Sequence, residues 1–154
     1  MTPTLLEELR QTKPFATLEE EALLSIVRTS AVLMDDFEQR LKPYGITATQ
    51  YNVLRILRGS EPAGLCRNDL RDRMLTRMPD VTRLLDRMEE AGLVERARGD
   101  EDRRMVGTRI TKEALRLLAK LDKVVADDQK RRFHGVNAKQ IQSLIDVLGA
   151  LRQP

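Results

Sequence analysis

Apolar residues recur every three or four positions along most of the sequence, a spacing typical of helices with one buried face. The first long stretch of this kind runs from about Leu18 to Leu41 and ends before Pro43 and Gly45. Its expected inward positions are Leu23, Ile26, Val27, Met34, Phe37 and Leu41. Further helices are expected at about 48–58, 66–74, 77–91, 112–133 and 138–152.

Several helix starts carry residues whose side chains satisfy free backbone amides. Capping boxes, in which a Glu or Gln follows the first residue by three positions, are expected at Thr17, Thr47 and Asn137. Thr76 and Thr111 are expected to cap the helices that follow them, and Gly92 to end the helix at 77–91.

The spacing of apolar and polar residues changes after residue 92, from the helical repeat to alternation. Leu93–Arg98 and Met105–Ile110 have the alternation of two short strands, joined by a polar turn at 99–103. Two short helices followed at once by a hairpin predict a winged helix-turn-helix over 46–111. The second helix of such a unit enters the DNA major groove and the hairpin is the wing, so the fold class is mostly α with a small β-hairpin wing.

The helix at 77–91 has an apolar face and an opposite, polar face. The apolar face consists of Val81, Leu84, Leu85 and Met88. Because the N-terminal half of a recognition helix reaches base edges, DNA contacts are predicted at Thr76, Pro79, Asp80, Thr82, Arg83 and Arg87. Arg83 can bond guanine with both arms of its guanidinium. Asp80 can accept from cytosine or hold Arg83 from one turn away.

The predicted wing carries acids beside arginines, at Asp102, Arg103 and Arg104. A carboxylate can fix the direction of a neighbouring guanidinium, which then enters a narrow A·T-rich minor groove. The alternative is a charged turn that only keeps the hairpin solvated.

With these segments in view, residues 46–118 resemble the multiple-antibiotic-resistance regulator (MarR) family. The segments that carry the resemblance are 46–51, 80–96, 102–104 and 109–111, in this order and spacing. The resemblance implies a transcriptional regulator, usually a repressor, that binds a pseudo-palindromic operator as an obligate homodimer. It implies that Asp102 and Arg104 act together, with the arginine in the minor groove, and that small, often aromatic, ligands or oxidants release the DNA.

Three positions depart from the usual pattern of that family. Cys66 stands where many members cap the third helix with Ser or Thr, and Ala114 where many have Gly. The recognition helix is expected to open with Arg77-Met78-Pro79, and Pro79 removes one backbone donor.

The chain is interpreted as one MarR-like domain over 1–154, with dimerisation helices at 15–43 and 112–152. A dimer hides the apolar residues of the last helix best, namely Ile141, Leu144, Ile145, Leu148 and Leu151. A small organic anion is expected to bind between the dimerisation helices and the recognition helix. The candidate contacts are Met34, Phe37, Tyr44 and Arg55. The alternative for these four is ordinary core and surface.

Charge and composition agree with a nucleic-acid partner. The formal net charge is +3, and between Arg55 and Arg109 there are 13 Arg and no Lys. Arg matches phosphate and guanine geometry better than Lys, although an Arg-rich genome gives the same bias. The single cysteine, the absence of a signal peptide and a longest apolar run of Ala31–Met34 indicate a cytoplasmic protein outside the membrane.

Other function classes fit the sequence less well. One His, one Cys and no glycine-rich phosphate loop argue against an enzyme, a cofactor or a metal site. Cys66, near a helix start where a thiolate is stabilised, leaves a redox-responsive regulator open, and a small buried residue is the competing interpretation. A winged helix used only for protein contacts is the remaining alternative.

Overall fold

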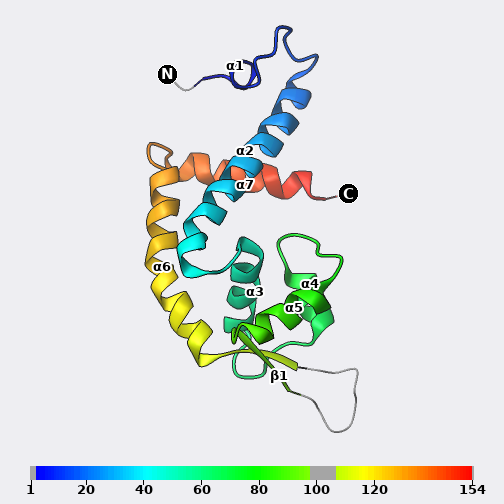
Figure 1. The fold of residues 1–154 in the computed structure, drawn as a ribbon. Coiled ribbons are helices and arrows are strands. Elements are labelled where there is room, and N and C mark those ends of the chain that lie inside the picture. Colours follow the sequence, from blue (N-terminus) through cyan, green and yellow to red (C-terminus); the bar gives the residue numbers. More distant parts are fainter. Residues whose placement is uncertain (1–2, 98–106, 154) are drawn as a thin grey trace.

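The computed structural model describes residues 3–97 and 107–153. Their elements are α1 (Leu5–Glu8), α2 (Leu18–Leu41), the 3-10 helix η1 (Lys42–Tyr44), α3 (Ala48–Arg58), α4 (Arg67–Arg73), α5 (Val81–Glu90), β1 (Val94–Ala97), β2 (Gly107–Ile110), α6 (Lys112–Arg132) and α7 (Ala138–Leu151). The expected fold, mostly helical with a small hairpin, is confirmed. In Figure 1, α3, α4, α5 and the hairpin gather at one end of the molecule, and α2 and α6 lead away from them.

The helix boundaries follow the capping residues. Thr47 and Asn137 form complete capping boxes, as expected. The Thr17 hydroxyl accepts from the Glu20 amide at 3.1 Å, but the Glu20 carboxylate accepts from the amide of Ala16 instead of Thr17. The box expected there is therefore only half formed.

The start of α5 differs from the sequence prediction. The helix begins at Val81 with Asp80 as its N-cap, so a helix from residue 77 capped by Thr76 is wrong. The physical reason is Pro79, which disfavours helical backbone at the residue before it, Met78. The helix starts only after the proline, at the next side chain that can cap it.

The core lies in the lobe formed by α3 to β2 and the first half of α6. Its buried apolar residues run from Leu41 to Leu121, and Val53, Leu54 and Leu57 of α3 are fully enclosed. The strands pair antiparallel, with Val94 opposite Ile110 and Arg96 opposite Thr108. Helix α3 therefore packs at the centre of the lobe.

A third chain segment joins the hairpin through Leu65. Its amide and carbonyl exchange hydrogen bonds with Thr108 at 3.0 and 2.7 Å. Gly64, just before it, has a φ of +73°, and a Cβ there would lie 2.6 Å from the Thr108 carbonyl oxygen. Only glycine fits this close approach without strain.

Helix α6 is tied to the rest of the chain by charged pairs. Asp128, whose side chain is only 10% exposed, contacts Arg40 of α2 at 2.9 Å and Arg131 and Arg132 of its own helix at 2.6 and 3.3 Å. Burial alone would raise the pKa of Asp128, but the hydrogen bonds from Arg131 and Arg132 and the charge of Arg40 together lower it. The carboxylate therefore holds α2 and α6 together in its ionised form.

The apolar faces of α2 and α7 stay largely exposed within one chain. Leu23 and Val27 of α2 are 57% and 66% exposed, and of the six positions expected to face inward only Leu41 is buried. Helix α7 has no buried residue, and Leu144 is 46% exposed. These faces do not belong to the core of a single chain.

Candidate nucleic-acid interface

Helix α5 lies on the lobe with one face inward. Val81, Leu85 and Met88 are buried and Leu84 packs against the same core, as the periodicity predicted. The opposite face is exposed and carries Thr82, Arg83, Asp86, Arg87 and Glu90. The fold therefore presents two arginines and a hydroxyl outward from one helix.

The predicted contacts at the start of α5 do not all lie on the helix. Thr76 and Pro79 are exposed in the segment that joins α4 to α5. Asp80 Oδ1 accepts from the Arg83 backbone amide at 2.9 Å, so Asp80 holds the main chain of Arg83 and caps the helix.

The joining segment is anchored to α3. The amide of Leu75 donates to Asn52 Oδ1 at 3.0 Å, and Met78 is half-buried against the core. The exposed residues of the segment are therefore held at a defined position beside α5.

Exposed arginines lie on both helices and on the segment that joins them. They are Arg67, Arg71 and Arg73 of α4, Arg77 of the joining segment, and Arg83 and Arg87 of α5. Arg67 Nη1 donates to the Thr82 hydroxyl at 2.9 Å, which joins the two helices directly. Sequence reasoning missed Arg67, because a contact between residues 15 positions apart leaves no periodic signal.

The base of the hairpin is fixed to α5 by a second contact that the sequence did not indicate. Arg96 of β1 forms ion pairs with Asp86 and, at 3.6 Å, with Glu89, both on α5. The Arg96 side chain is only 20% exposed. The predicted wing residues Asp102, Arg103 and Arg104 lie outside the described residues.

Of the four predicted ligand contacts, Phe37 and Arg55 lie against the same side chain, that of Tyr51. Phe37 packs edge-on against Tyr51 with 5.2 Å between ring centroids, and Arg55 lies over the same ring at 5.9 Å. Arg55 Nη1 also donates to the Tyr51 hydroxyl at 3.3 Å, whereas Met34 is exposed on α2. Tyr44 lines a hollow whose lining does not include the other three residues.

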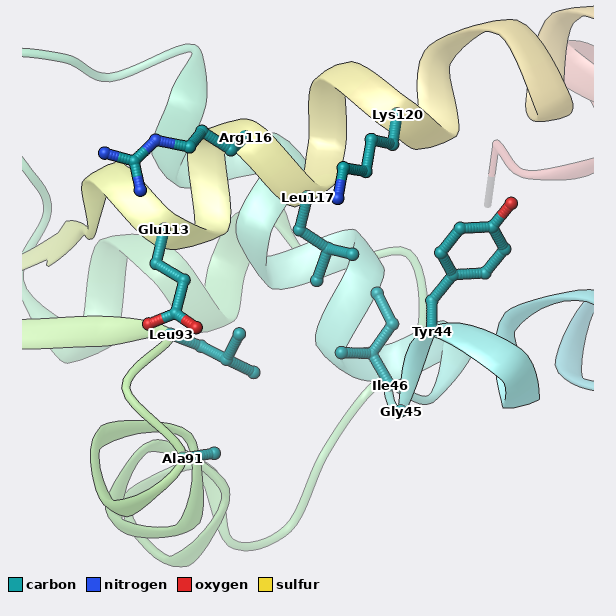
Figure 2. Close-up of a pocket in the computed structure, with 9 residues that line it drawn as sticks. All are labelled: Tyr44, Gly45, Ile46, Ala91, Leu93, Glu113, Arg116, Leu117 and Lys120. Carbon is teal, nitrogen blue, oxygen red and sulfur yellow. The ribbon is translucent and has the colours of Figure 1, made fainter.

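This hollow, of about 450 Å³, lies between α6 and the segments that follow α2 and α5. Its lining residues are Tyr44, Gly45, Ile46, Ala91, Leu93, Glu113, Arg116, Leu117 and Lys120. Figure 2 shows Lys120 directing its ammonium group toward the apolar side chains of Ile46 and Leu117. The hollow thus combines apolar side chains with two basic residues, Arg116 and Lys120, and one acidic residue, Glu113.

Cys66 has a structural role as the N-cap of α4. Its Sγ accepts from the Asp69 amide at 3.4 Å, and the residue is half-buried rather than fully buried. Across residues 3–97 and 107–153, no group of three His, Cys, Asp or Glu side chains is arranged to hold a metal ion. In that same part of the chain, no helix has both the length and the apolar character to cross a membrane.

Comparison with known proteins gives consistent matches. The MarR family model matches residues 44–105. A MarR transcription factor from Planctomyces limnophilus is 34% identical over 89% of this chain and 99% of its own, with a TM-score of 0.68. The transcriptional repressor CouR, bound to a 23-mer DNA duplex, is 22% identical over 99% of this chain and 100% of its own, with a TM-score of 0.75. MepR from S. aureus, in a complex with DNA, is 20% identical over 88% and 94% of the two chains, with a TM-score of 0.71.

Proposed function

The chain belongs to the MarR family of transcription factors, and from that premise we propose that it represses transcription by binding double-stranded DNA as a homodimer. Membership of this family makes it a transcriptional regulator and not an enzyme. The observation that carries the proposal is α5, which turns Thr82, Arg83 and Arg87 outward immediately before a β-hairpin. A helix followed directly by a β-hairpin is the order of a recognition helix and its wing in a winged helix-turn-helix.

Helix α5 is proposed to lie in the major groove, where each base pair presents a distinct set of donors and acceptors. The guanidinium group of Arg83 is proposed to donate two hydrogen bonds, to O6 and N7 of one guanine. Asp80 uses one carboxylate oxygen as a cap and has a second that can accept from cytosine N4. Four other exposed arginines, Arg71, Arg73, Arg77 and Arg87, are proposed to contact the phosphate backbone together with Thr76. Pro79 is proposed to lie at a base edge.

The dimer is proposed to form through helices in residues 15–43 and 112–152, leaving 46–111 as the DNA-binding lobe. The exposed apolar faces of α2 and α7 support this arrangement, because a single chain leaves them in water. A two-fold dimer requires a pseudo-palindromic operator, with half-sites about one helical turn, ~34 Å, apart. CouR and MepR, which have the same fold and were solved with DNA, are precedents for the DNA binding alone.

The wing is proposed to add a contact in the minor groove. Arg104 would enter a narrow A·T-rich stretch, and Asp102 would direct its guanidinium, with Arg103 beside them. A double-mutant cycle of Asp102→Ala and Arg104→Ala on operators with A·T-rich and G·C-rich flanks tests this. Strong non-additivity with flank dependence supports the role, and full additivity without it contradicts the role.

Release by a small molecule is proposed to occur at the hollow lined by Tyr44 and Lys120. Its apolar side chains and the Lys120 ammonium group suit an organic carboxylate with an apolar body, bound at the Lys120 end and away from the Glu113 carboxylate. Helix α6 forms one wall of the hollow, and the residues after α5 form another. A bound ligand would therefore connect the position of the dimerisation helices with that of the recognition helix α5.

Calorimetric titration with benzoate and octanoate tests the effector site. Binding that disappears in Lys120→Met and persists in Arg55→Met supports the hollow. The reverse result would assign the ligand to the surroundings of Arg55, Phe37 and Met34. No heat in either titration, with DNA binding unchanged, contradicts a carboxylate effector.

DNA binding itself is tested by selecting duplexes from a random library and measuring affinity for the selected sequence across a salt series. We expect a symmetric consensus and a steep loss of affinity with salt, because phosphate contacts release counterions. No enriched sequence and a flat salt series would favour the alternative, a winged helix that contacts other proteins.

A further inference from the structure

The hydrogen bond between Arg67 and Thr82 links the two helices of the helix-turn-helix at the surface that faces DNA in the proposed function. Arg67 is the first residue of α4 and Thr82 lies in the first turn of α5. Arg67 Nη1 lies 2.9 Å from the Thr82 hydroxyl oxygen, and both residues are exposed.

We propose that Arg67 is a positioning residue for base recognition, one that orients the Thr82 hydroxyl as a hydrogen-bond donor to the major groove. The inference rests on the proposed function and names a residue that determines its sequence preference. The expected partner of Thr82 is an acceptor on a base edge: N7 or O6 of a purine, or O4 of thymine.

The direction of the bond follows from the chemistry of the two groups. A guanidinium has only donors, so Arg67 must donate and the Thr82 oxygen must accept. A hydroxyl has one proton, which then points away from the cation. The nearby positive charge also polarises the O–H bond and makes it a stronger donor.

Thr82 is the second residue of α5, so no earlier turn of that helix offers a carbonyl to fix its hydroxyl. Among the described residues, the hydrogen bond from Arg67 is the contact recorded for that hydroxyl. Without it, the exposed side chain could exchange between staggered rotamers. The bond from Arg67 therefore selects the orientation in which Thr82 can distinguish bases.

The competing role for Arg67 is a direct phosphate contact, and the two roles differ in what they change. A phosphate contact adds affinity for every sequence and steepens the salt dependence by about one unit of slope. A positioning role changes the preference at one base position and acts only through Thr82.

The test first selects a duplex from a random library with the wild-type protein. Affinities of wild type, Arg67→Ala, Thr82→Val and the double variant are then measured on that duplex and on its single-base substitutions. Arg67→Ala and Thr82→Val should weaken discrimination at the same position of each half-site, by about three- to tenfold, as expected for one hydrogen bond. The double variant should lose no more than Thr82→Val alone, and the salt slope of Arg67→Ala should match wild type.

Two variants serve as controls. Thr82→Ser keeps a hydroxyl and should retain most of the preference. Arg71→Ala removes another exposed arginine of α4, whose Nε bonds Asp72 at 3.3 Å, and should leave base preference unchanged. Thermal melting of each variant confirms that it is folded.

An unchanged base preference in Arg67→Ala, with a uniform loss of affinity and a shallower salt slope, would overturn the inference and make Arg67 a phosphate contact. The inference would also be overturned if Arg67→Ala changed the base preference by the same amount in the Thr82→Val protein as in the wild type. If the wild type enriches no sequence, the proposed function itself fails, which is a different result.

Discussion

Arg96 of β1 and Asp86 of α5 form an ion pair that joins the base of the hairpin to the helix proposed to read DNA. Glu89, one turn further along α5, lies 3.6 Å from the same guanidinium. Because the Arg96 side chain is largely buried, the pair fixes the angle between α5 and the hairpin. In the proposed function, the two elements would therefore meet the duplex as one unit.

Removing this link should weaken DNA binding more than it weakens the fold. Asp86 and Glu89 are about half-exposed, so Arg96→Ala should cost about 1 kcal/mol or less in the free energy of unfolding. We expect a loss of DNA affinity of roughly tenfold, about 1.4 kcal/mol, because two elements must be re-aligned on binding. Fluorescence anisotropy on the selected duplex measures it. Glu95→Ala, an exposed residue of the same strand, is the control, and an equal effect of both variants would contradict this role for Arg96.

Gly64→Ala should destabilise the lobe strongly. Its φ of +73° strains any other residue, and the added Cβ would meet the Thr108 carbonyl oxygen at 2.6 Å. We expect a loss of about 2 kcal/mol or more in chemical denaturation. Gly45→Ala has the same φ but nothing within 4 Å, so its loss should stay near 1 kcal/mol. Equal losses would mean that the approach of residue 64 to the Thr108 carbonyl oxygen is not tight.

Asp128 should make stability depend on acid. The folded state lowers the pKa of Asp128, so the stability it contributes is fully present above the carboxyl's unfolded pKa, about 4, and is lost as pH falls through the lower folded value. Asp128→Asn should lower the free energy of unfolding at pH 7 by about 1–3 kcal/mol, and the deficit relative to wild type should shrink below pH 4. Urea denaturation at pH 7 and pH 3 measures both values. Asp127→Asn, on an exposed pair with Lys123, is the control and should change little. A deficit independent of pH would contradict the role of the charge.

The sequence predicts most of the fold because its signals are local. Thr47 and Thr111 mark the starts of α3 and α6, and each hydroxyl accepts the expected amide at 3.1 Å. The start of α5 was misplaced because Thr76 also looks like a cap, whereas Pro79 delays the helix to Val81.

The interface was less predictable, because its key contacts join distant residues. The periodicity of α5 placed Thr82 and Arg83 on the outer face correctly. It carried no information about Arg67 or Arg96, whose partners lie on other elements. The apolar stripe of α2 was recognised, but periodicity does not say whether the covering surface belongs to the same chain.

A charged substitution on α7 should separate the subunits. Burying a leucine contributes about 1.5–3 kcal/mol, and an arginine in its place also adds an unpaired charge. Leu144→Arg should therefore be monomeric in analytical ultracentrifugation and should lose DNA binding at the same time. Ser143→Arg, on the polar side of α7, should remain dimeric and bind DNA. A monomeric Leu144→Arg that binds the selected duplex as tightly as wild type would contradict the proposed dimer.

The most direct measurement of the central claim is the base preference of Arg83→Ala on the selected duplex and its single-base variants. An arginine that bonds a base edge should cost about 1–3 kcal/mol when removed, and its loss should relax the preference at one position in each half-site, symmetrically about the centre. That result would establish α5 as the reader helix of a two-fold dimer. A full, unchanged preference in Arg83→Ala, or a loss spread evenly over all positions, would contradict it.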